Sequence, residues 1–439
     1  MRSHPLTNLI GGSALVFLCR LAGAITVFVS QILMARWMGA DSLGIYVLAF
    51  SWSLLLSTAT GLGFPAASLR FIGENVGSGN RGLIKGFIRH SRITVLLSSG
   101  ITAVIGAGLI FLLDDVIPAS YQQAMLITMA CIPILTLFRL QDKIAHAYSW
   151  FGLAFAPSMA IRPLLFLILV AAVFYLQKQL SAGQAMGLQF IALALVTLIQ
   201  YLLIRPRLAR ELGSADEQYV RRGWTTTAIP LLITTLFVQY FPELSVALIG
   251  TLLPSADVAI FYSCFRIALF IGFVLTAVNA LLTPQISRLH SAGKLQELQA
   301  RVTQTTRLKF ASAILFLALL GLFGRTILSW FGQEFVSGYD TLIILAASQL
   351  ILAATGPVDQ LLNLTGHHNR SLIAFSSSIP FAIVLMLFFV PLMGINGAAL
   401  VILLTALFWN LWLHYAVVKH LGIYPSVFAR ANRLVDTGA

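Results

Sequence analysis

The chain is poor in charged residues and in cysteine. Only 10% of its 439 residues are charged, whereas 58% are hydrophobic, and the mean hydropathy is +0.89. Soluble domains carry roughly 25% charged residues, so this composition excludes a soluble globule. Apolar stretches close to the ~20 residues that span a bilayer core recur along the whole chain. The sequence therefore predicts an all-α polytopic membrane protein.

The scarcity of cysteine and the lack of enzyme motifs exclude several classes of site. The three cysteines, Cys19, Cys131 and Cys264, lie in apolar stretches and form no CxxC pair, so no disulfide framework or zinc site is predicted. The sequence contains no GxGxxG fingerprint, P-loop or HExxH motif. The His367–His368 pair has no third ligand nearby in the sequence. We therefore expect no catalytic residue, no cofactor and no metal.

Hydropathy predicts twelve membrane spans. They cover residues 11–35, 43–64, 93–113, 123–146, 151–176, 186–204, 226–252, 258–283, 310–330, 341–363, 372–392 and 396–418.

The net charge of +13 follows this span pattern. Of the 28 basic residues, 22 fall at the two termini and in the loops that follow even-numbered spans, counting cations at the ends of spans with the loops. The opposite loops hold only Arg36 and Lys178. Because loops rich in Lys and Arg stay in the cytoplasm, both termini are predicted to be cytoplasmic. The excess of basic residues thus indicates membrane orientation, and no nucleic acid partner is expected.

The chain contains an internal repeat. The stretch ADSLGIY begins at Ala40 and ADVAIFY begins at Ala256, 216 residues later. Asp142 and Asp359 are 217 residues apart. An offset of six spans preserves orientation, so we predict two parallel six-helix lobes, residues 1–212 and 213–439. Such halves typically enclose a central cavity whose access alternates between the two sides of the membrane.

Three arginines lie deep within predicted spans: Arg20, Arg162 and Arg266. An arginine at the bilayer centre costs about 2.5–3.5 kcal/mol on insertion scales, so these side chains should face protein or water. Helical periodicity places Gln31 on the face of Arg20, and Tyr262 beside Arg266. Guanidinium groups match phosphate oxygens, which favours an anionic cargo. Alternatively, Arg162 caps carbonyls freed at a proline kink.

Two carboxylates are also predicted to lie within spans. Glu243 shares a helix face with Gln239, and Asp359 follows the Gly356–Pro357 pair. Each is a candidate for proton or sodium coupling. Each also has a structural alternative: Glu243 as an ion-pair partner of an arginine, and Asp359 as a partner of broken backbone or of a neighbouring loop.

Several motifs together resemble a known family. LMARWMGADSLGIYVLAF and GLGFPAASLRFIGEN occur in the first half, and LIGTLLPSADVAIFYSCFRIALFIGF and ATGPVDQLLNLTGHHNRS in the second. They resemble bacterial oligosaccharide-lipid flippases, in the polysaccharide-exporter branch of the multidrug/oligosaccharidyl-lipid/polysaccharide exporter superfamily. The resemblance covers roughly residues 8–422.

The resemblance implies a fold and a cargo. The fold would be a V-shaped, alternating-access bundle of six plus six helices. The cargo would be an undecaprenyl-diphosphate-linked oligosaccharide for a surface polysaccharide such as O-antigen, lipopolysaccharide or exopolysaccharide. It would move from the cytoplasmic to the outer leaflet of the bacterial inner membrane, with its diphosphate held by Arg20 and Arg266. The chain ends soon after span 12, without two further helices of the lipid II flippase, so lipid II is the less expected cargo.

Partners and alternatives remain open at this point. Membrane lipids and a polysaccharide polymerase are expected partners, and a monomer suffices because two halves supply both lobes. A cation-coupled multidrug antiporter is the nearest alternative, although cationic drugs favour acidic cavities. A membrane glycosyltransferase, polymerase or ligase would need a catalytic loop, and the outer loops are too short to fold. A passive scramblase would share the fold without coupling.

Overall fold

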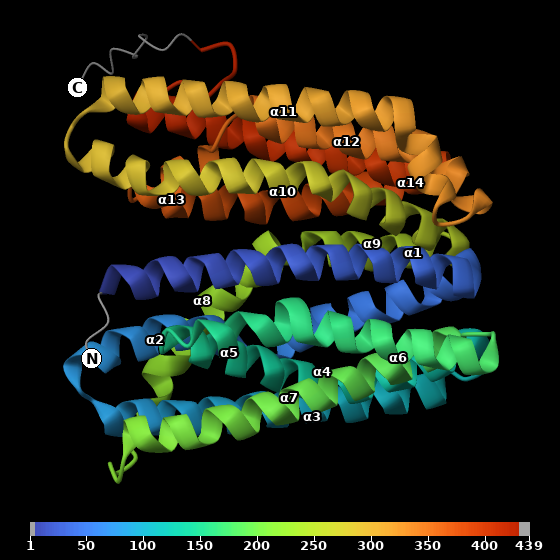
Figure 1. The fold of residues 1–439 in the computed structure, drawn as a ribbon, viewed down its shortest axis with the longest axis horizontal. Helices are drawn as coiled ribbons and strands as arrows, with labels where there is room; N and C mark the ends of the chain where they lie inside the picture. Colours follow the sequence, from blue (N-terminus) through green and yellow to red (C-terminus); the bar gives the residue numbers. More distant parts are fainter. Residues whose placement is uncertain (1–4, 430–439) are drawn as a thin grey trace. The chain divides into compact units, whose positions relative to one another are not determined.

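The computed structural model describes residues 5–429 (Figure 1). Side chains are described from residue 18 onward, except at 233–234, 237–239, 273–278, 280–281 and 368. Over these residues the chain is helical, as predicted. Its elements are α1 (Pro5–Thr60), α2 (Phe64–Ser78), α3 (Arg81–Leu112), α4 (Ala119–Ala147), α5 (Phe151–Ala156), the π-turn η1 (Pro157–Ile161), α6 (Arg162–Gln177), α7 (Ala182–Leu212), α8 (Arg221–Gln239), α9 (Phe241–Leu252), α10 (Ser255–Ser291), α11 (Leu295–Ser329), the 3-10 turn η2 (Gln333–Gly338), α12 (Tyr339–Ala354), α13 (Val358–Leu364) and α14 (His368–Leu421).

The helices coincide with the predicted spans, but two of them are double. The segments Leu18–Thr60 and Asn369–Leu421 contain 43 and 53 residues. At 1.5 Å per residue each is more than twice as long as the ~30 Å hydrocarbon thickness. Each is interrupted by a left-handed glycine, Gly39 (φ 73°) or Gly394 (φ 58°). Glycine adopts positive φ without a Cβ clash, so these two residues separate consecutive spans.

Two other predicted spans are broken. The span at 226–252 divides at Tyr240 into α8 and α9, and the span at 341–363 divides before Pro357 into α12 and α13. Among the described residues, nine helices are long and apolar enough to cross a membrane. The positions of the helices are thus as predicted, whereas the count of twelve crossings stays a prediction.

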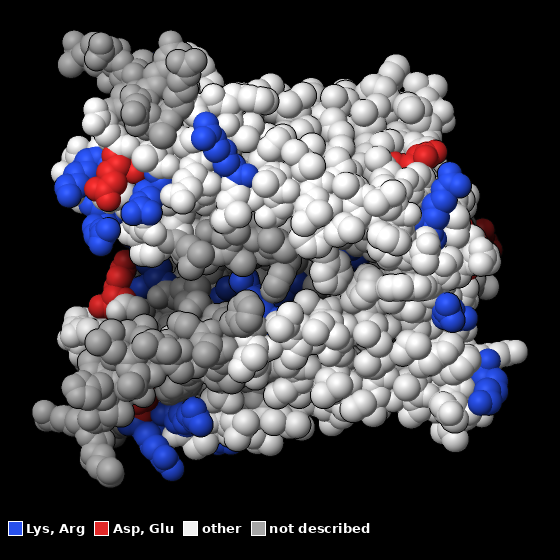
Figure 2. Space-filling model, turned by 45° about the horizontal axis from the view of Figure 1, so that its top comes forward, with Lys and Arg blue, Asp and Glu red and all other residues white. Residues whose placement is uncertain are grey.

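Apolar side chains cover the outer surface of the helices. On α3, Val104 and Leu112 are 74% and 81% exposed, and on α11 Leu322 is 77% exposed. Figure 2 shows broad surfaces without charge, with most of the visible Lys and Arg near helix ends. Exposed leucine and valine in such numbers suit a hydrocarbon environment, and helices satisfy their own backbone hydrogen bonds there. The chain is a multi-pass membrane protein.

The chain folds as two compact units, residues 1–247 and 248–439. The first contains α1 to α8 and half of α9. It extends beyond residue 212 because α8 packs on α2, where buried Trp224 joins Phe71 and Phe87 in an aromatic cluster. The predicted six-helix lobes, residues 1–212 and 213–439, describe the sequence repeat and stay a prediction.

In the first unit α4 is the central helix. Leu140 and Ile144 pack in one core with Ile204 of α7 and Phe64 of α2. The carbonyls of α1 accept hydrogen bonds from threonines of α4, including Ser57 O from Thr136 at 3.2 Å. These contacts hold α4 between α1, α2 and α7.

The π-turn η1 lies between α5 and α6, immediately before Arg162 and Pro163. π-Turns of this kind often mark functional sites. A Cβ on Gly23 of α1 would lie 1.8 Å from the carbonyl oxygen of Met159, so only glycine allows α1 to approach the turn this closely.

In the second unit a segment after α14 crosses the ends of α11 and α12. We call residues 422–429 the C-terminal strap. The Gln299 side chain accepts from Tyr424 N at 2.8 Å and donates to Tyr424 O at 3.0 Å. Val427 N donates to Ala354 O at 3.0 Å. These bonds fix the strap at one end of the unit.

Candidate functional site

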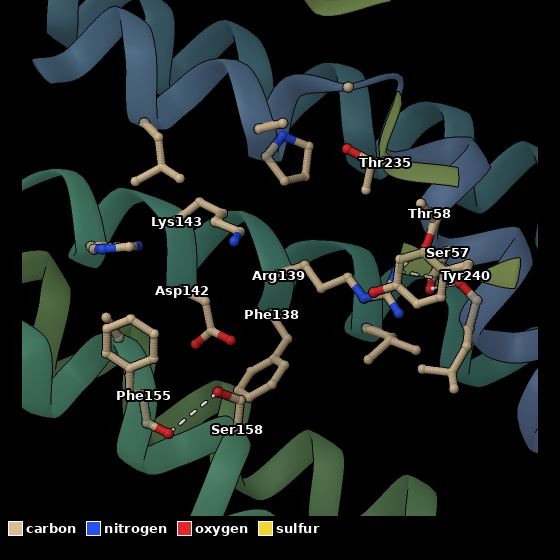
Figure 3. Close-up of a pocket in the computed structure, with 18 of the residues that line it drawn as sticks. Ser57, Thr58, Phe138, Arg139, Asp142, Lys143, Phe155, Ser158, Thr235 and Tyr240 are labelled. Atoms are coloured by element: carbon tan, nitrogen blue, oxygen red, sulfur yellow. Dashed lines mark hydrogen bonds between the residues drawn. The ribbon is translucent and has the colours of Figure 1, made fainter. Parts of the chain in front are cut away.

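The first unit contains a pocket of about 430 Å³ (Figure 3). It is formed by α1, α2, α4, α5, η1, the start of α6 and the end of α8. Its polar lining comprises Ser57, Thr58, Arg139, Asp142, Lys143, His146, Ser158, Arg162, Thr235 and Tyr240. Three basic side chains thus face one carboxylate. The balance of charge suits an anion.

One face of α4 supplies most of this charge. Arg139, Asp142, Lys143 and His146 follow the spacing i, i+3, i+4, i+7, which aligns side chains along one side of a helix. Leu140, between them in sequence, is fully buried on the core side. The same helix therefore anchors the unit with one face and lines the pocket with the other.

Arg139 joins three helices. Its Nη1 donates to the hydroxyl of Thr58 and, at 3.3 Å, to the carbonyl of Leu54, both on α1. Its guanidinium carbon lies 4.6 Å from the ring centroid of Tyr240, at the end of α8. Hydrogen bonds on one side and the aromatic face on the other fix the plane of the guanidinium group.

The Asp142 carboxylate is held from α7. Gln200 Nε2 donates to Asp142 Oδ1 at 2.7 Å and to the carbonyl of Leu153 at 2.9 Å. The Ser158 hydroxyl of η1 is within hydrogen-bonding reach of the carboxylate, and Figure 3 shows the Asp142 side chain directed toward it. The carboxylate is therefore fixed in place opposite the π-turn.

Two N–H groups of the Arg162 guanidinium are available to bind a ligand. Its guanidinium carbon lies 5.9 Å from the Phe50 ring centroid, and the charges of Arg139 and Asp142 act on it. Its Nε and Nη1 atoms are buried and have no hydrogen-bond partner among the described residues. A buried charged donor without a partner costs about 1–3 kcal/mol or more. An anion in the pocket would satisfy both.

The residues predicted from sequence are distributed over both units. In the first, Arg162 lines the pocket, whereas Arg20 is exposed on α1 and does not belong to it. Gln31 is also on α1, and its amide oxygen is buried without a hydrogen-bond partner among the described residues. Glu243 lies in the first turn of α9, half-buried. The side chain of Gln239 falls outside the described residues.

In the second unit the structure brings together Arg266 and Tyr262. Arg266 Nη2 donates to the Tyr262 hydroxyl at 2.6 Å, and the guanidinium carbon lies 4.9 Å from the ring centroid. The pair follows from the i, i+4 spacing on α10, as predicted. Asp359 lies on α13, where it interacts electrostatically with Lys309 of α11.

Sequence reasoning missed Arg139, Lys143 and Lys309 as internal groups. All three were counted as loop cations because they lie near the ends of predicted spans. In the structure Arg139 and Lys143 line the pocket, and Lys309 is 3% exposed, 14 residues after the start of α11. The i, i+3, i+4, i+7 spacing on α4 was the available signal for the first two.

Comparisons with known proteins agree on family and fold. The model of the family "Polysaccharide biosynthesis protein" matches residues 9–290, and that of the family "MatE" matches residues 230–388. No sequence among the curated proteins matches the chain.

Solved structures share the fold at low identity. An inward-facing multidrug resistance MATE family transporter of the MOP superfamily is 15% identical, with a TM-score of 0.74 over 91% of this chain and 98% of its own. The lipid II flippase MurJ, in an inward closed conformation, is 14% identical, with a TM-score of 0.73 over 92% of this chain and 87% of its own. The MATE transporter VcmN of Vibrio cholerae is 17% identical, with a TM-score of 0.54 over 94% of this chain and 98% of its own.

Proposed function

This chain belongs to the family of polysaccharide biosynthesis proteins, and we propose on that basis that it is a flippase. Its cargo is an undecaprenyl-diphosphate-linked oligosaccharide, moved from the cytoplasmic to the outer leaflet for surface polysaccharide export. The chain is a transporter of this kind and not an enzyme of the pathway. It acts in the bacterial inner membrane as a monomer, with both termini in the cytoplasm.

The observation that carries the proposal is the cationic pocket on α4. A diphosphate has several oxygens that accept hydrogen bonds, and planar guanidinium groups bind them through paired donors. Arg162 presents buried N–H groups that no described residue accepts from, and Arg139 is fixed beside it by Thr58 and Tyr240. We assign the first contact with the diphosphate to these two arginines and Lys143.

Arg20 and Arg266 retain the role that the family resemblance implies. Arg20 is exposed on α1, and Arg266 is oriented by Tyr262. In the proposal they receive the diphosphate during the transport cycle. Glu243 and Asp359 are the candidate sites for proton or sodium coupling. Neutralising both should change the pH or sodium dependence of transport, and unchanged dependence would remove them from that role.

A cation-coupled multidrug antiporter is the second candidate. It is favoured by the similarity of the fold to that of a multidrug resistance transporter. The pocket charge argues against it, because Arg139, Lys143 and Arg162 outnumber Asp142 and would repel a cationic drug.

The test is translocation of a lipid-linked oligosaccharide in proteoliposomes. Wild type is compared with Arg162→Ala, Arg20→Ala and Arg266→Ala at equal protein levels. Loss of charge-assisted bonds to a phosphate should reduce translocation about 10- to 100-fold. Arg325→Ala is the matched control, because Arg325 lies over the Tyr339 ring at 4.9 Å in the second unit, outside the pocket. Absent translocation by wild type, together with drug-stimulated ion flux, would favour the antiporter.

A further inference from the structure

Asp142 is out of place in a pocket that otherwise suits an anion. Among the described residues, the charged and titratable groups that line the pocket around it come from three helices. Arg139, Lys143 and His146 come from α4, Arg162 from the start of α6 and Tyr240 from the end of α8.

The remaining elements add little charge. Gln200 of α7 and Ser158 of η1 contact the carboxylate without charge. Tyr46 of α1 acts on Arg162. The residues of α2 and α5 that line the pocket carry no ionisable group.

A bound phosphate and the Asp142 carboxylate would compete for the same cations. The charges of Arg162 and Lys143 both act on Asp142. Without an anion in the pocket, Asp142 is the one acidic side chain among the described lining residues that balances them. A phosphate that binds the N–H groups of Arg162, which have no partner among the described residues, places a second negative charge in the same protein-lined space. Two like charges that share a site favour protonation of one of them.

The surroundings of Asp142 can accommodate a proton. Gln200 donates to Oδ1 alone, so Oδ2 can carry the hydrogen. A protonated carboxyl group is a donor and an acceptor at once, and it can donate to an oxygen of the bound anion. The carboxylate, which repels the anion, thereby becomes a ligand for it.

We propose that Asp142 binds one proton when an anion binds at Arg162, so that anion binding in this pocket is linked to proton uptake. The O–H bond forms on the Asp142 carboxylate with a proton from the aqueous side, and the proton returns there when the anion leaves. The inference rests on the anionic cargo of the proposed function and adds its regulation by pH. Linkage is reciprocal: protonation of Asp142 strengthens anion binding by the same factor by which the bound anion strengthens proton binding. Lowering the pH must therefore strengthen anion binding.

The probe is sulfate, whose charge is constant between pH 5.5 and about 8.5, so only protein groups titrate. Binding to the detergent-solubilised full chain is measured by calorimetry over this range. His146→Gln serves as the parent, because His146 lines the pocket and histidine is the side chain that ordinarily changes charge between about pH 5 and 8. Sulfate affinity of this parent should fall with rising pH by up to about tenfold per unit, the slope of one linked proton.

The decisive variant is Asp142→Asn in the same parent. It should bind sulfate at least as tightly at high pH as the parent does at low pH, without the pH dependence. Arg162→Ala should abolish binding in either form. Should the asparagine variant fold poorly, proton uptake is measured directly on the parent, by calorimetry in buffers of different ionisation enthalpy.

The outcomes separate the two proposals. Sulfate binding that is independent of pH in the parent, or unchanged in its pH dependence by Asp142→Asn, overturns the proton link and leaves the anion pocket intact. Sulfate that fails to bind wild type at any pH overturns the anion pocket, and the proton link with it. Release of protons upon binding also overturns the link.

Discussion

Asp142 and Asp359 occupy matching places in the two halves of the sequence, yet they lie in different environments. Asp142 lines a pocket with three basic residues and is held by Gln200. Asp359 lies in the second unit near the buried Lys309 of α11. The difference shows that a sequence repeat preserves the position of a carboxylate without preserving its access to a ligand.

The segments that follow α7 in the first unit and α14 in the second unit differ in a related way. In the first unit residues 213–220 lie against the start of α3, where Gln218 N donates to Gly82 O at 3.1 Å and Arg89 pairs with Glu217 at 2.8 Å. In the second unit the C-terminal strap crosses the ends of α11 and α12, so that Pro425 lies against Gly356, three residues before Asp359. The first segment, which is the connector between α7 and α8, is held on α3, whereas the second packs against the break between α12 and α13.

The largest effect is expected for Lys309, which is buried and acts electrostatically on Asp359. Lys309→Ala empties a buried site and leaves Asp359 without this cationic neighbour, so it should cost about 2–5 kcal/mol, as truncation of other long buried side chains does. Lys143→Ala, which truncates a lysine lining the pocket of the first unit, should cost less than about 1 kcal/mol. The check is chemical denaturation in detergent. Restored stability in the double variant Lys309→Met/Asp359→Leu would support the interaction between these two residues. Equal stability of Lys309→Ala and Lys143→Ala would contradict it.

The next effect concerns the strap. Gly356 has φ +76°, and a Cβ there would lie 2.3 Å from the carbonyl oxygen of Pro425. Gly356→Ala should therefore destabilise the chain by about 1–3 kcal/mol, from strain and displacement of the strap. Gly366→Ala is the matched control, because Gly366 has φ +86° and a Cβ there would meet no heavy atom of the described residues within 4 Å. Faster proteolysis after α14 should accompany the first variant and be absent from the second.

A smaller effect, on sulfate affinity, is expected from the contact between Tyr240 and Arg139 in the pocket. Tyr240→Leu removes the aromatic face under Arg139, which is worth about 0.5–2 kcal/mol, so sulfate should bind roughly 2- to 30-fold more weakly. Tyr339→Leu removes the equivalent contact of Arg325 in the second unit and should leave sulfate binding unchanged. An equal loss in both variants would mean that the pocket does not depend on the orientation of Arg139.

The smallest effect is expected at the connector in the first unit. The Tyr219 hydroxyl, which donates to Glu217 at 2.5 Å, and the Arg89 ion pair lower the pKa of Glu217 below its ordinary value of 4.5. A lowered pKa means that this attachment is complete above pH 4.5 and is lost as the pH falls through the lower, folded-state pKa. In wild type, cleavage of residues 213–220 in limited proteolysis should increase as the pH is lowered from 4.5 through the folded-state pKa of Glu217. Glu217→Gln should show the increased cleavage already at neutral pH, and a flat profile in both would refute the role.

The positions of the helices could be predicted because membrane insertion depends on local hydrophobicity. The break at Gly39 and the Arg266–Tyr262 contact are also local, since they depend on residues a few positions apart. Arg162 could be recognised as an internal group because it lies far from either end of its span. Lys309 could not, because hydropathy assigns a cation near a span end to the loop, whereas its burial depends on α11 packing with α12 and α10.

The sequence by itself determined that this chain is a helical membrane protein, where its helices lie and which charges fall within them, because a bilayer admits only long apolar helices. The tertiary structure alone decided which of those charges meet. Arg139, Asp142 and Arg162 share a pocket because α4 is held among α1, α2 and α7 and because the π-turn brings the start of α6 to its face. Asp359 instead acts electrostatically on Lys309, because α13 packs against α14 and α10. How helices pack against one another is not contained in the sequence of any single helix.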